Sequence, residues 1–176
     1  QSAAHMVNQL LAMARAENKE EAARKQPVNL ARLATETVRD FVPRALEKRI
    51  DLGYEGPESS PLTVSGHSLL LRELIRNLVD NALKYSRHRP DPVIDLGFDS
   101  ERRAFYLKDN GMGFDMAHAH KLFGLFQRLH AGAAAPGGTG VGLAIVARTL
   151  ERHGGRIWAE AETGRGATFW WTLPMA

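Results

Sequence analysis

The 176-residue sequence contains no cysteine, which excludes disulfides and thiolate metal sites. It has no apolar run of membrane-spanning length and no signal-peptide pattern, so we predict a cytoplasmic chain, or the cytoplasmic part of an inner-membrane sensor, without direct membrane contact. The net charge of +3 is small, and no basic cluster alternates with aromatic residues, which argues against nucleic-acid binding. The closely spaced His118 and His120 have no further ligand-type neighbours, and we interpret them as surface residues.

What is present fits one globular domain with an appended helix, because 44% of the residues are hydrophobic. The first apolar residues recur at helical spacing: Val7, Leu10, Leu11 and Ala14. We predict a helix that ends near Arg24, and Gln26-Pro27 separates it from the rest of the chain. We therefore divide the chain into an N-terminal helix with its linker, residues 1–26, and a globular domain, residues 27–176. The first helix either packs on its own domain or forms a homodimer through residues 1–25, and the separating proline favours the dimer.

The second segment alternates irregularly between helical and strand patterns. Helices are predicted over 29–49, with Asn29 as N-cap, over 68–85 and over 143–153. Strands are predicted over 50–54, 62–64, 93–98, 104–108, 156–160 and 167–173, the third and fourth forming a hairpin. This order predicts an α+β two-layer sandwich rather than a doubly wound sheet. A Gly/Ala-rich stretch over 130–138 is expected to be mobile.

A polar stripe marks the otherwise apolar helix predicted over 68–85. Glu73, Asn77 and Asn81 lie at i, i+4 and i+8, on one face of the helix. Asparagine carbonyls suit a hard cation that also binds phosphate oxygens. Lys84 and Tyr85 follow at the C-terminal end, where a lysine can meet phosphate charge and a tyrosine ring can stack on a base. The alternative, an ordinary solvated face with Tyr85 in the core, is equally supported by this helix alone.

Two glycine-containing motifs follow. Asp109 ends a predicted strand and precedes Gly111 and Gly113, which let the backbone approach a ligand closely. A carboxylate at a strand end can accept a hydrogen bond from an amine such as adenine N6. The second motif, residues 138–142, precedes a helix, and backbone N–H groups at a helix N-terminus bind phosphate. A tight turn and a flexible hinge are the alternatives, and a Walker-type loop is excluded because its lysine motif is missing.

Two phenylalanines precede the Gly/Ala-rich stretch. With Phe123 and Phe126 on one side and glycines on the other, the intervening segment resembles a lid over a nucleotide. Arg128 lies near enough in sequence to reach the phosphates of that nucleotide. The alternatives are two core phenylalanines and a surface arginine.

Taken in order, these motifs resemble the catalytic, ATP-binding domain of bacterial sensor histidine kinases of two-component signalling, one branch of the Bergerat-fold ATPases. The resemblance covers about residues 28–173, and the phenylalanine motif and the closing segment 163–169 are specific to the kinase branch. It implies a protein-histidine kinase that uses ATP and Mg²⁺. The implied partners are a histidine-bearing dimerisation domain and the receiver domain of a response regulator.

The resemblance also implies a role for each matching residue. Asn77 coordinates Mg²⁺, and Asn81 and Lys84 lie near the phosphates. Tyr85 flanks the base, and Asp109 reads the adenine.

Further roles follow from the same resemblance. Thr168 supports the adenine-reading aspartate, and Glu73 corresponds to the general base of the hydrolytic relatives. The implied catalytic set is Glu73, Asn77, Lys84 and Arg128. The residues that shape the pocket and its lid are Gly111, Gly113, Phe123, Phe126, Gly138, Thr139, Gly140, Val141, Gly142 and Leu143.

The first helix departs from a complete kinase. It resembles the second helix of the dimerisation domain, but His5 does not stand in the family's phosphoacceptor box. We therefore predict that the accepting histidine lies outside this chain. His67 also stands where the family more often has aspartate. The alternatives are a hydrolytic Bergerat-fold ATPase and a nucleotide-binding regulatory module without kinase activity.

Overall fold

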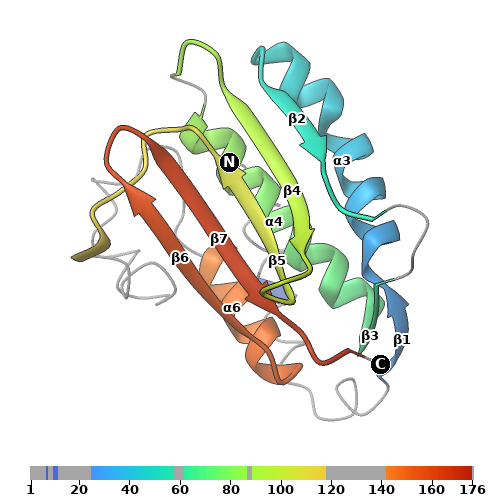
Figure 1. Ribbon diagram of the computed structural model, residues 1–176. Coiled ribbons are helices and arrows are strands. Elements are labelled where there is room, and N and C mark those ends of the chain that lie inside the picture. Colours follow the sequence, from blue (N-terminus) through green and yellow to red (C-terminus); the bar gives the residue numbers. More distant parts are fainter. Residues whose placement is uncertain are drawn as a thin grey trace.

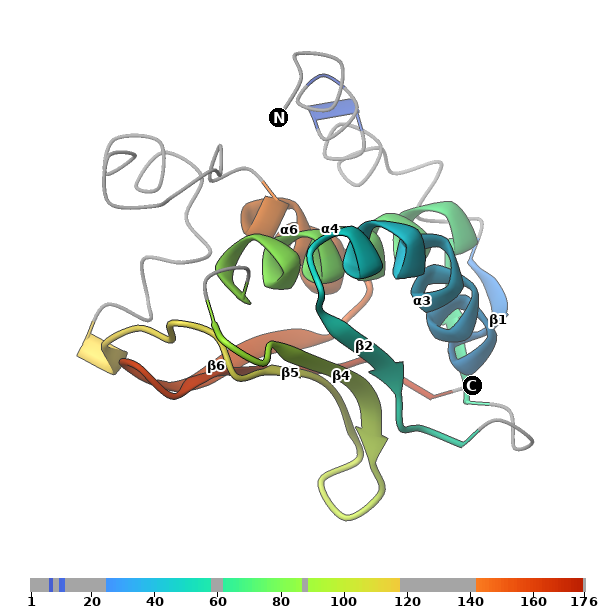
Figure 2. The same cartoon turned by 90° about the horizontal axis from the view of Figure 1, so that it is seen from above.

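The computed structural model describes residues 7, 10, 11, 25–57, 62–86, 89–117 and 142–175. In this part of the chain, α3, α4 and α6 cover one face of a five-stranded sheet, and no helix covers the opposite face (Figures 1 and 2). The predicted α+β two-layer sandwich is therefore confirmed. None of the helices in the described ranges has the length and apolar character needed to cross a membrane.

The helices are α3 (Leu30–Glu47), α4 (Ser68–Ser86) and α6 (Gly142–Arg152). The strands are β1 (Gln26–Asn29), β2 (Asp51–Tyr54), β3 (Thr63–Gly66), β4 (Val93–Asp99), β5 (Ala104–Asp109), β6 (Arg156–Glu162) and β7 (Gly166–Thr172). Every element predicted in these ranges is present, with ends within two residues of the expected ones. Strand β1 was not predicted, because its four residues include Pro27, which we interpreted as a separator.

The strands form two sheets. The large sheet has the order β2-β4-β5-β7-β6, with β2 parallel to β4 and every other pair antiparallel. The small sheet pairs β1 with β3. In the large sheet Asp109 pairs with Ala167, and Lys108 pairs with Thr168. Because neighbouring side chains on a strand point to opposite faces, this register decides which of them face the helices.

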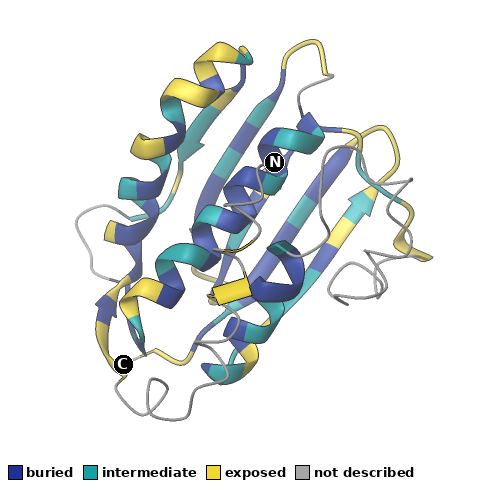
Figure 3. Cartoon of the chain, turned by 180° about the vertical axis from the view of Figure 1, so that it is seen from behind, coloured by how far each residue is buried: buried dark blue, intermediate teal, exposed yellow. Residues whose placement is uncertain are grey.

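Helix α4 lies between α3 and α6 on the sheet, as the view from above shows (Figure 2). Most of its length is buried (Figure 3). Its buried apolar side chains are Leu70, Leu71, Leu74, Ile75, Leu78, Val79, Ala82 and Leu83. A helix held on several sides in this way is a rigid base for the polar residues that it carries.

The N-cap of α3 yields a first testable prediction. The side chain of Asn29 accepts a hydrogen bond from the backbone N–H of Arg32 at 3.2 Å, as expected for an N-cap. We expect Asn29→Ala to lower the free energy of unfolding by about 1 kcal/mol, and Asn29→Ser to retain most of it. Urea denaturation of the three proteins measures this, and equal stability of the alanine and serine variants would contradict the capping role.

Candidate functional site

The loop that follows β5 is fixed against the C-terminal end of α4. The N–H of Gly111 donates to Oδ1 of Asp109 at 2.8 Å, and the N–H of Met112 donates to the carbonyl oxygen of Tyr85 at 3.3 Å. On its other side, the carbonyl of Met112 accepts from the N–H of Gly164 at 2.7 Å. The end of β5, the end of α4 and the β6–β7 turn therefore meet at this loop.

Gly111 stands where three polar atoms converge. A Cβ at this position would lie 2.6 Å from the carbonyl oxygen of Tyr85, 2.9 Å from Oδ1 of Asp109 and 3.1 Å from Oγ of Ser86. No side chain fits there without displacing backbone. Ser86 is fully buried, and its Oγ has no hydrogen-bond partner in the described structure. A buried hydroxyl of this kind is normally satisfied by a protein group, a water or a ligand.

Gly113 is required for two reasons. Its φ is +63°, which favours glycine, and a Cβ would lie 2.8 Å from the carbonyl oxygen of Gly166 and collide with that of Glu162. The predicted close approach of the backbone to a ligand stays a prediction, since the close neighbours of Gly111 and Gly113 in the structure are protein atoms.

Asn110, which the sequence analysis did not assign, holds the loop to the start of β4. Its Oδ1 accepts from the N–H of Val93 at 2.8 Å, and its Nδ2 donates to the carbonyl of Asp91 at 2.8 Å. These two bonds fix the backbone immediately after Asp109, where β5 ends. The only sequence signal is that asparagine is common in such turns.

Asp109 is a buried carboxylate. Only 6% of the residue is exposed, and burial raises its pKa to about 6, although hydrogen bonds from the backbone N–H groups of Gly111 and Ala167 act to lower the pKa. Because a desolvated carboxylate is costly, an additional donor from a ligand would stabilise its ionised form. The site can therefore recognise a group with an N–H, such as an exocyclic amine.

Thr168 is not part of this site, and the prediction that it supports Asp109 is wrong. Thr168 pairs with Lys108, so its side chain lies on the sheet face opposite that of Asp109. The supporting group is the backbone N–H of the preceding residue, Ala167, which pairs with Asp109 across the two strands.

The polar stripe of α4 has the predicted helical geometry. Asn77 is 4% exposed, whereas Asn81 and Glu73 are half-buried on the same face. Tyr85 is also half-buried, next to the loop that carries Gly111. The C-terminal end of α4, the helix that carries the stripe, thus lies at the loop that follows the buried Asp109.

Lys84 takes part in an ion-pair chain that the sequence analysis missed. Its Nζ lies 3.1 Å from Oδ2 of Asp80, and Oδ1 of Asp80 lies 2.7 Å from Nη2 of Arg44 on α3. Burial acts to raise the pKa of Asp80, but the two cations outweigh it and hold that pKa below its usual value. The contact with Arg44 joins residues 36 positions apart, which no local pattern reveals.

A divalent metal would need help from a ligand at this site. The described residues contain no group of three or more His, Cys, Asp or Glu side chains that could hold a metal ion. Mg²⁺ commonly takes one or two protein ligands together with phosphate oxygens. The buried amide of Asn77 fits that arrangement, in which one protein ligand and phosphate oxygens share the metal.

Several predicted site residues lie outside the described part of the chain: Phe123, Phe126, Arg128, Gly138, Thr139, Gly140 and Val141. The predicted mobile stretch over 130–138 and His5 lie outside it as well. Gly142 and Leu143 are described, and they begin α6, where Leu143 is buried. The proposed phosphate-binding glycines therefore directly precede a helix N-terminus in sequence, as predicted.

Comparisons with known proteins show what this chain is similar to. The chain is 45% identical over 108 residues to the methanogenesis regulatory histidine kinase FilI of Methanothrix harundinacea, a match that covers 60% of this chain and 12% of FilI. The structure resembles that of full-length ShkA in complex with AMPPNP, with a TM-score of 0.75, 28% identity and coverage of 98% of this chain and 35% of ShkA. The chain thus spans only a small part of these relatives.

The catalytic domain of the histidine kinase ThkA has the same fold, with a TM-score of 0.71 at 22% identity and coverage of 86% of this chain and 96% of that domain. Residues 66–176, which include α4, the β5 loop and the closing strands, match the family of histidine kinase-, DNA gyrase B- and HSP90-like ATPases (HATPase_c). The chain belongs to this family, and its relatives and structural neighbours are histidine kinases.

Proposed function

We propose that this chain is the Mg-ATP-binding catalytic domain of a sensor histidine kinase. The observation that carries the proposal is Asp109, a buried carboxylate with a pKa raised to about 6 at the end of β5. Adenine can supply a further N–H donor to this carboxylate, through its exocyclic amine. The complex of the related ShkA with AMPPNP supports an adenine nucleotide as the ligand.

The helix next to this carboxylate provides the phosphate side of the proposed site. Asn77 would coordinate Mg²⁺ together with phosphate oxygens, and the ammonium of Lys84 would neutralise phosphate charge. Bound Mg²⁺ supplies charge neutralisation of the transferring phosphoryl group. Glu73 and Asn81 face the same side of α4, where they can orient the nucleotide.

We place the accepting histidine outside this chain, on a dimerisation domain of which residues 1–26 supply the C-terminal helix and the linker. Val7, Leu10 and Leu11 are helical, with exposed fractions of 52%, 42% and 49%. Three exposed apolar residues at helical spacing favour a helix that packs against a dimerisation partner. The phosphorylated histidine would then pass its phosphoryl group to the receiver domain of a response regulator in the cytoplasm, where ATP is supplied.

The test uses two measurements. Isothermal titration with AMPPNP, with and without Mg²⁺, should show Mg²⁺-dependent binding. Incubation with labelled ATP and a separately supplied histidine-bearing dimerisation domain should then place acid-labile phosphate on that domain. Steady release of inorganic phosphate without transfer would identify a hydrolytic ATPase. The absence of AMPPNP binding would favour a regulatory module, and labelled phosphate on His5 would contradict an external acceptor.

A further inference from the structure

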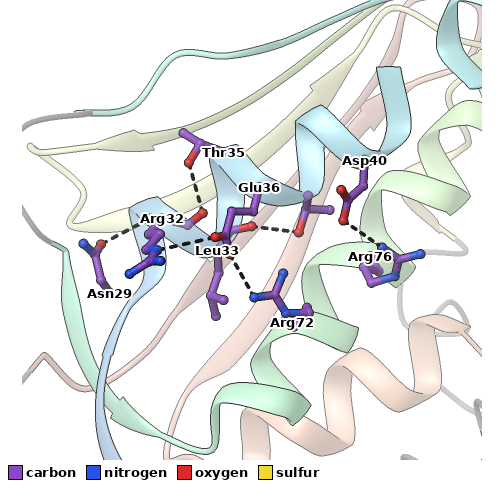
Figure 4. A network of polar contacts seen from close by, with 9 residues as sticks. Asn29, Arg32, Leu33, Thr35, Glu36, Asp40, Arg72 and Arg76 are labelled. Atoms are coloured by element: carbon purple, nitrogen blue, oxygen red, sulfur yellow. Dashed lines mark hydrogen bonds and ion pairs between the residues drawn. The ribbon is translucent and has the colours of Figure 1, made fainter. Parts of the chain in front are cut away.

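Ion pairs connect α3 with α4 at a constant offset along both helices. Glu36 pairs with Arg72 at 2.9 Å, and Asp40 pairs with Arg76 at 3.5 Å (Figure 4). In both pairs the acid lies on α3 and the arginine on α4, and the partners are 36 residues apart. These two pairs link helices that lie side by side, in partly exposed positions where such contacts add little stability.

The third pair keeps the offset of 36 residues but reverses the charges. Here the arginine is Arg44 on α3 and the acid is Asp80 on α4, with Nη2 and Oδ1 2.7 Å apart. The reversal places a carboxylate on the helix that carries the proposed phosphate-binding lysine. Asp80 lies four residues before Lys84, and the two side chains form an ion pair at 3.1 Å.

The acid of the reversed pair is more buried than the acids of the other two pairs, although its arginine is the most exposed of the three. The side chain of Asp80 is 8% exposed and that of Lys84 is 15% exposed, whereas Arg44 reaches the surface. Salt therefore screens the ion pair between Asp80 and Lys84 only weakly. One ionised carboxylate is therefore shared by two cations, which leaves one net positive charge in a sheltered position.

This positive charge lies on the proposed phosphate side of α4. Lys84 is seven residues after Asn77 and three after Asn81, so the three side chains emerge from the same side of the helix. We infer that Arg44 is a positioning residue for the nucleotide phosphates: it neutralises Asp80, so that the charge of Lys84 remains available to the phosphates. This inference rests on the proposed function.

The alternative is that Arg44 only joins the helices. Without Arg44, Asp80 and Lys84 would form a neutral pair, and the attraction for each phosphate charge would fall. A merely structural contact would instead affect every part of the ligand equally. The number of phosphates on the ligand therefore distinguishes the two roles.

Arg76 offers a matched control. The guanidinium carbons of Arg44 and Arg76 lie 4.9 and 5.0 Å from the centre of the same ring, that of Phe41. Substitution of either arginine by methionine removes one positive charge and retains an apolar stem over this ring. Arg76, however, pairs with the exposed Asp40 rather than with Asp80.

The experiment measures dissociation constants of adenosine, ADP and AMPPNP at one Mg²⁺ concentration and one ionic strength. We expect Arg44→Met to weaken ADP and AMPPNP binding roughly tenfold and to change adenosine binding less than about twofold. Arg76→Met should leave all three constants within about twofold, because its charge does not reach Asp80. Arg44→Lys should restore most of the nucleotide affinity.

A double-mutant cycle completes the test. In the Lys84→Met background, Arg44→Met should cause no further change in the ratio of ADP to adenosine affinity, because the charge that it modulates is gone. Equal weakening of adenosine and ADP by Arg44→Met, or no weakening at all, would overturn the inference. If the wild-type protein binds neither adenosine nor nucleotides, the proposed function itself fails, which is a different result from either of these.

Discussion

Asp109→Asn is expected to weaken ATP binding roughly 10- to 150-fold and, at the same time, to stabilise the nucleotide-free domain at pH 7. The loss of affinity follows because an ionised acceptor is replaced by a neutral amide, and a hydrogen bond to a charged group contributes about 1.5–3 kcal/mol. The gain in stability follows because wild-type Asp109 is ionised at pH 7 while only 6% exposed. The residue that binds adenine in our proposal thus costs the folded protein stability.

The size of the stability effect depends on pH. Burial raises the pKa of Asp109 from 3.8 to about 6, so between these values the folded protein binds more protons than the unfolded chain. The stability associated with protonated Asp109 is complete below pH 3.8 and is lost as the pH rises through 6. The wild type should therefore be less stable than the variant by as much as about 3 kcal/mol at pH 7, and the difference should vanish toward pH 4.

The affinity of the wild-type protein should follow the same titration. In our proposal ATP binds the ionised form of Asp109, so protonation of this carboxylate competes with ATP binding. The affinity for ATP should therefore fall up to tenfold for each pH unit below about 6. Urea denaturation and isothermal titration between pH 4.5 and 8 measure both effects. Asp91→Asn is the control, since the side chain of Asp91 is exposed and the same charge is removed.

A stability difference that does not change with pH would contradict the buried ionised carboxylate. Full ATP affinity of Asp109→Asn would contradict its role in reading adenine. The two results are independent, so the buried ionised state of Asp109 and its proposed binding of adenine are tested separately.

Local patterns were sufficient to predict most of the fold. The helical spacing on α4, the capping by Asn29 and the alternation in the β4–β5 hairpin depend on residues that are close in sequence, and each of these elements is present in the structure. The need for glycine after Asp109 was predictable for the same reason, because the chain must turn immediately after a strand. These features need no knowledge of the partner strands or helices.

The errors concern features that depend on distant partners. Thr168 and Ala167 are adjacent, and only the register between β5 and β7 decides which of them meets Asp109. Strand β1 forms because β3 pairs with it, despite Pro27. The contact between Arg44 and Asp80 likewise depends on how α3 packs against α4. A single sequence does not specify these pairings, although the repeated spacing of charges on both helices is visible once the helices are known to be neighbours.

Gly166→Ala is expected to lower the free energy of unfolding by at least about 3 kcal/mol. Gly166 begins β7 with a φ of +111°, a conformation that side chains rarely adopt. A Cβ there would also collide with the carbonyl oxygen of Asp109 and lie 2.8 Å from Cα of Asn110. Relief of this collision must separate β7 from the strand end that carries the buried carboxylate, so ATP affinity should fall together with stability.

Gly164→Ala separates the two causes. Gly164 also has a positive φ, +82°, but a Cβ there would meet nothing within 4 Å. Gly164→Ala should therefore lower the free energy of unfolding only by the conformational penalty, about 1–2 kcal/mol, and should leave ATP binding unchanged. Denaturation and titration of both variants give the comparison. If Gly166→Ala costs no more than Gly164→Ala, the strands can separate without penalty, and the close approach of β7 to Asp109 is not what fixes the carboxylate in the pocket.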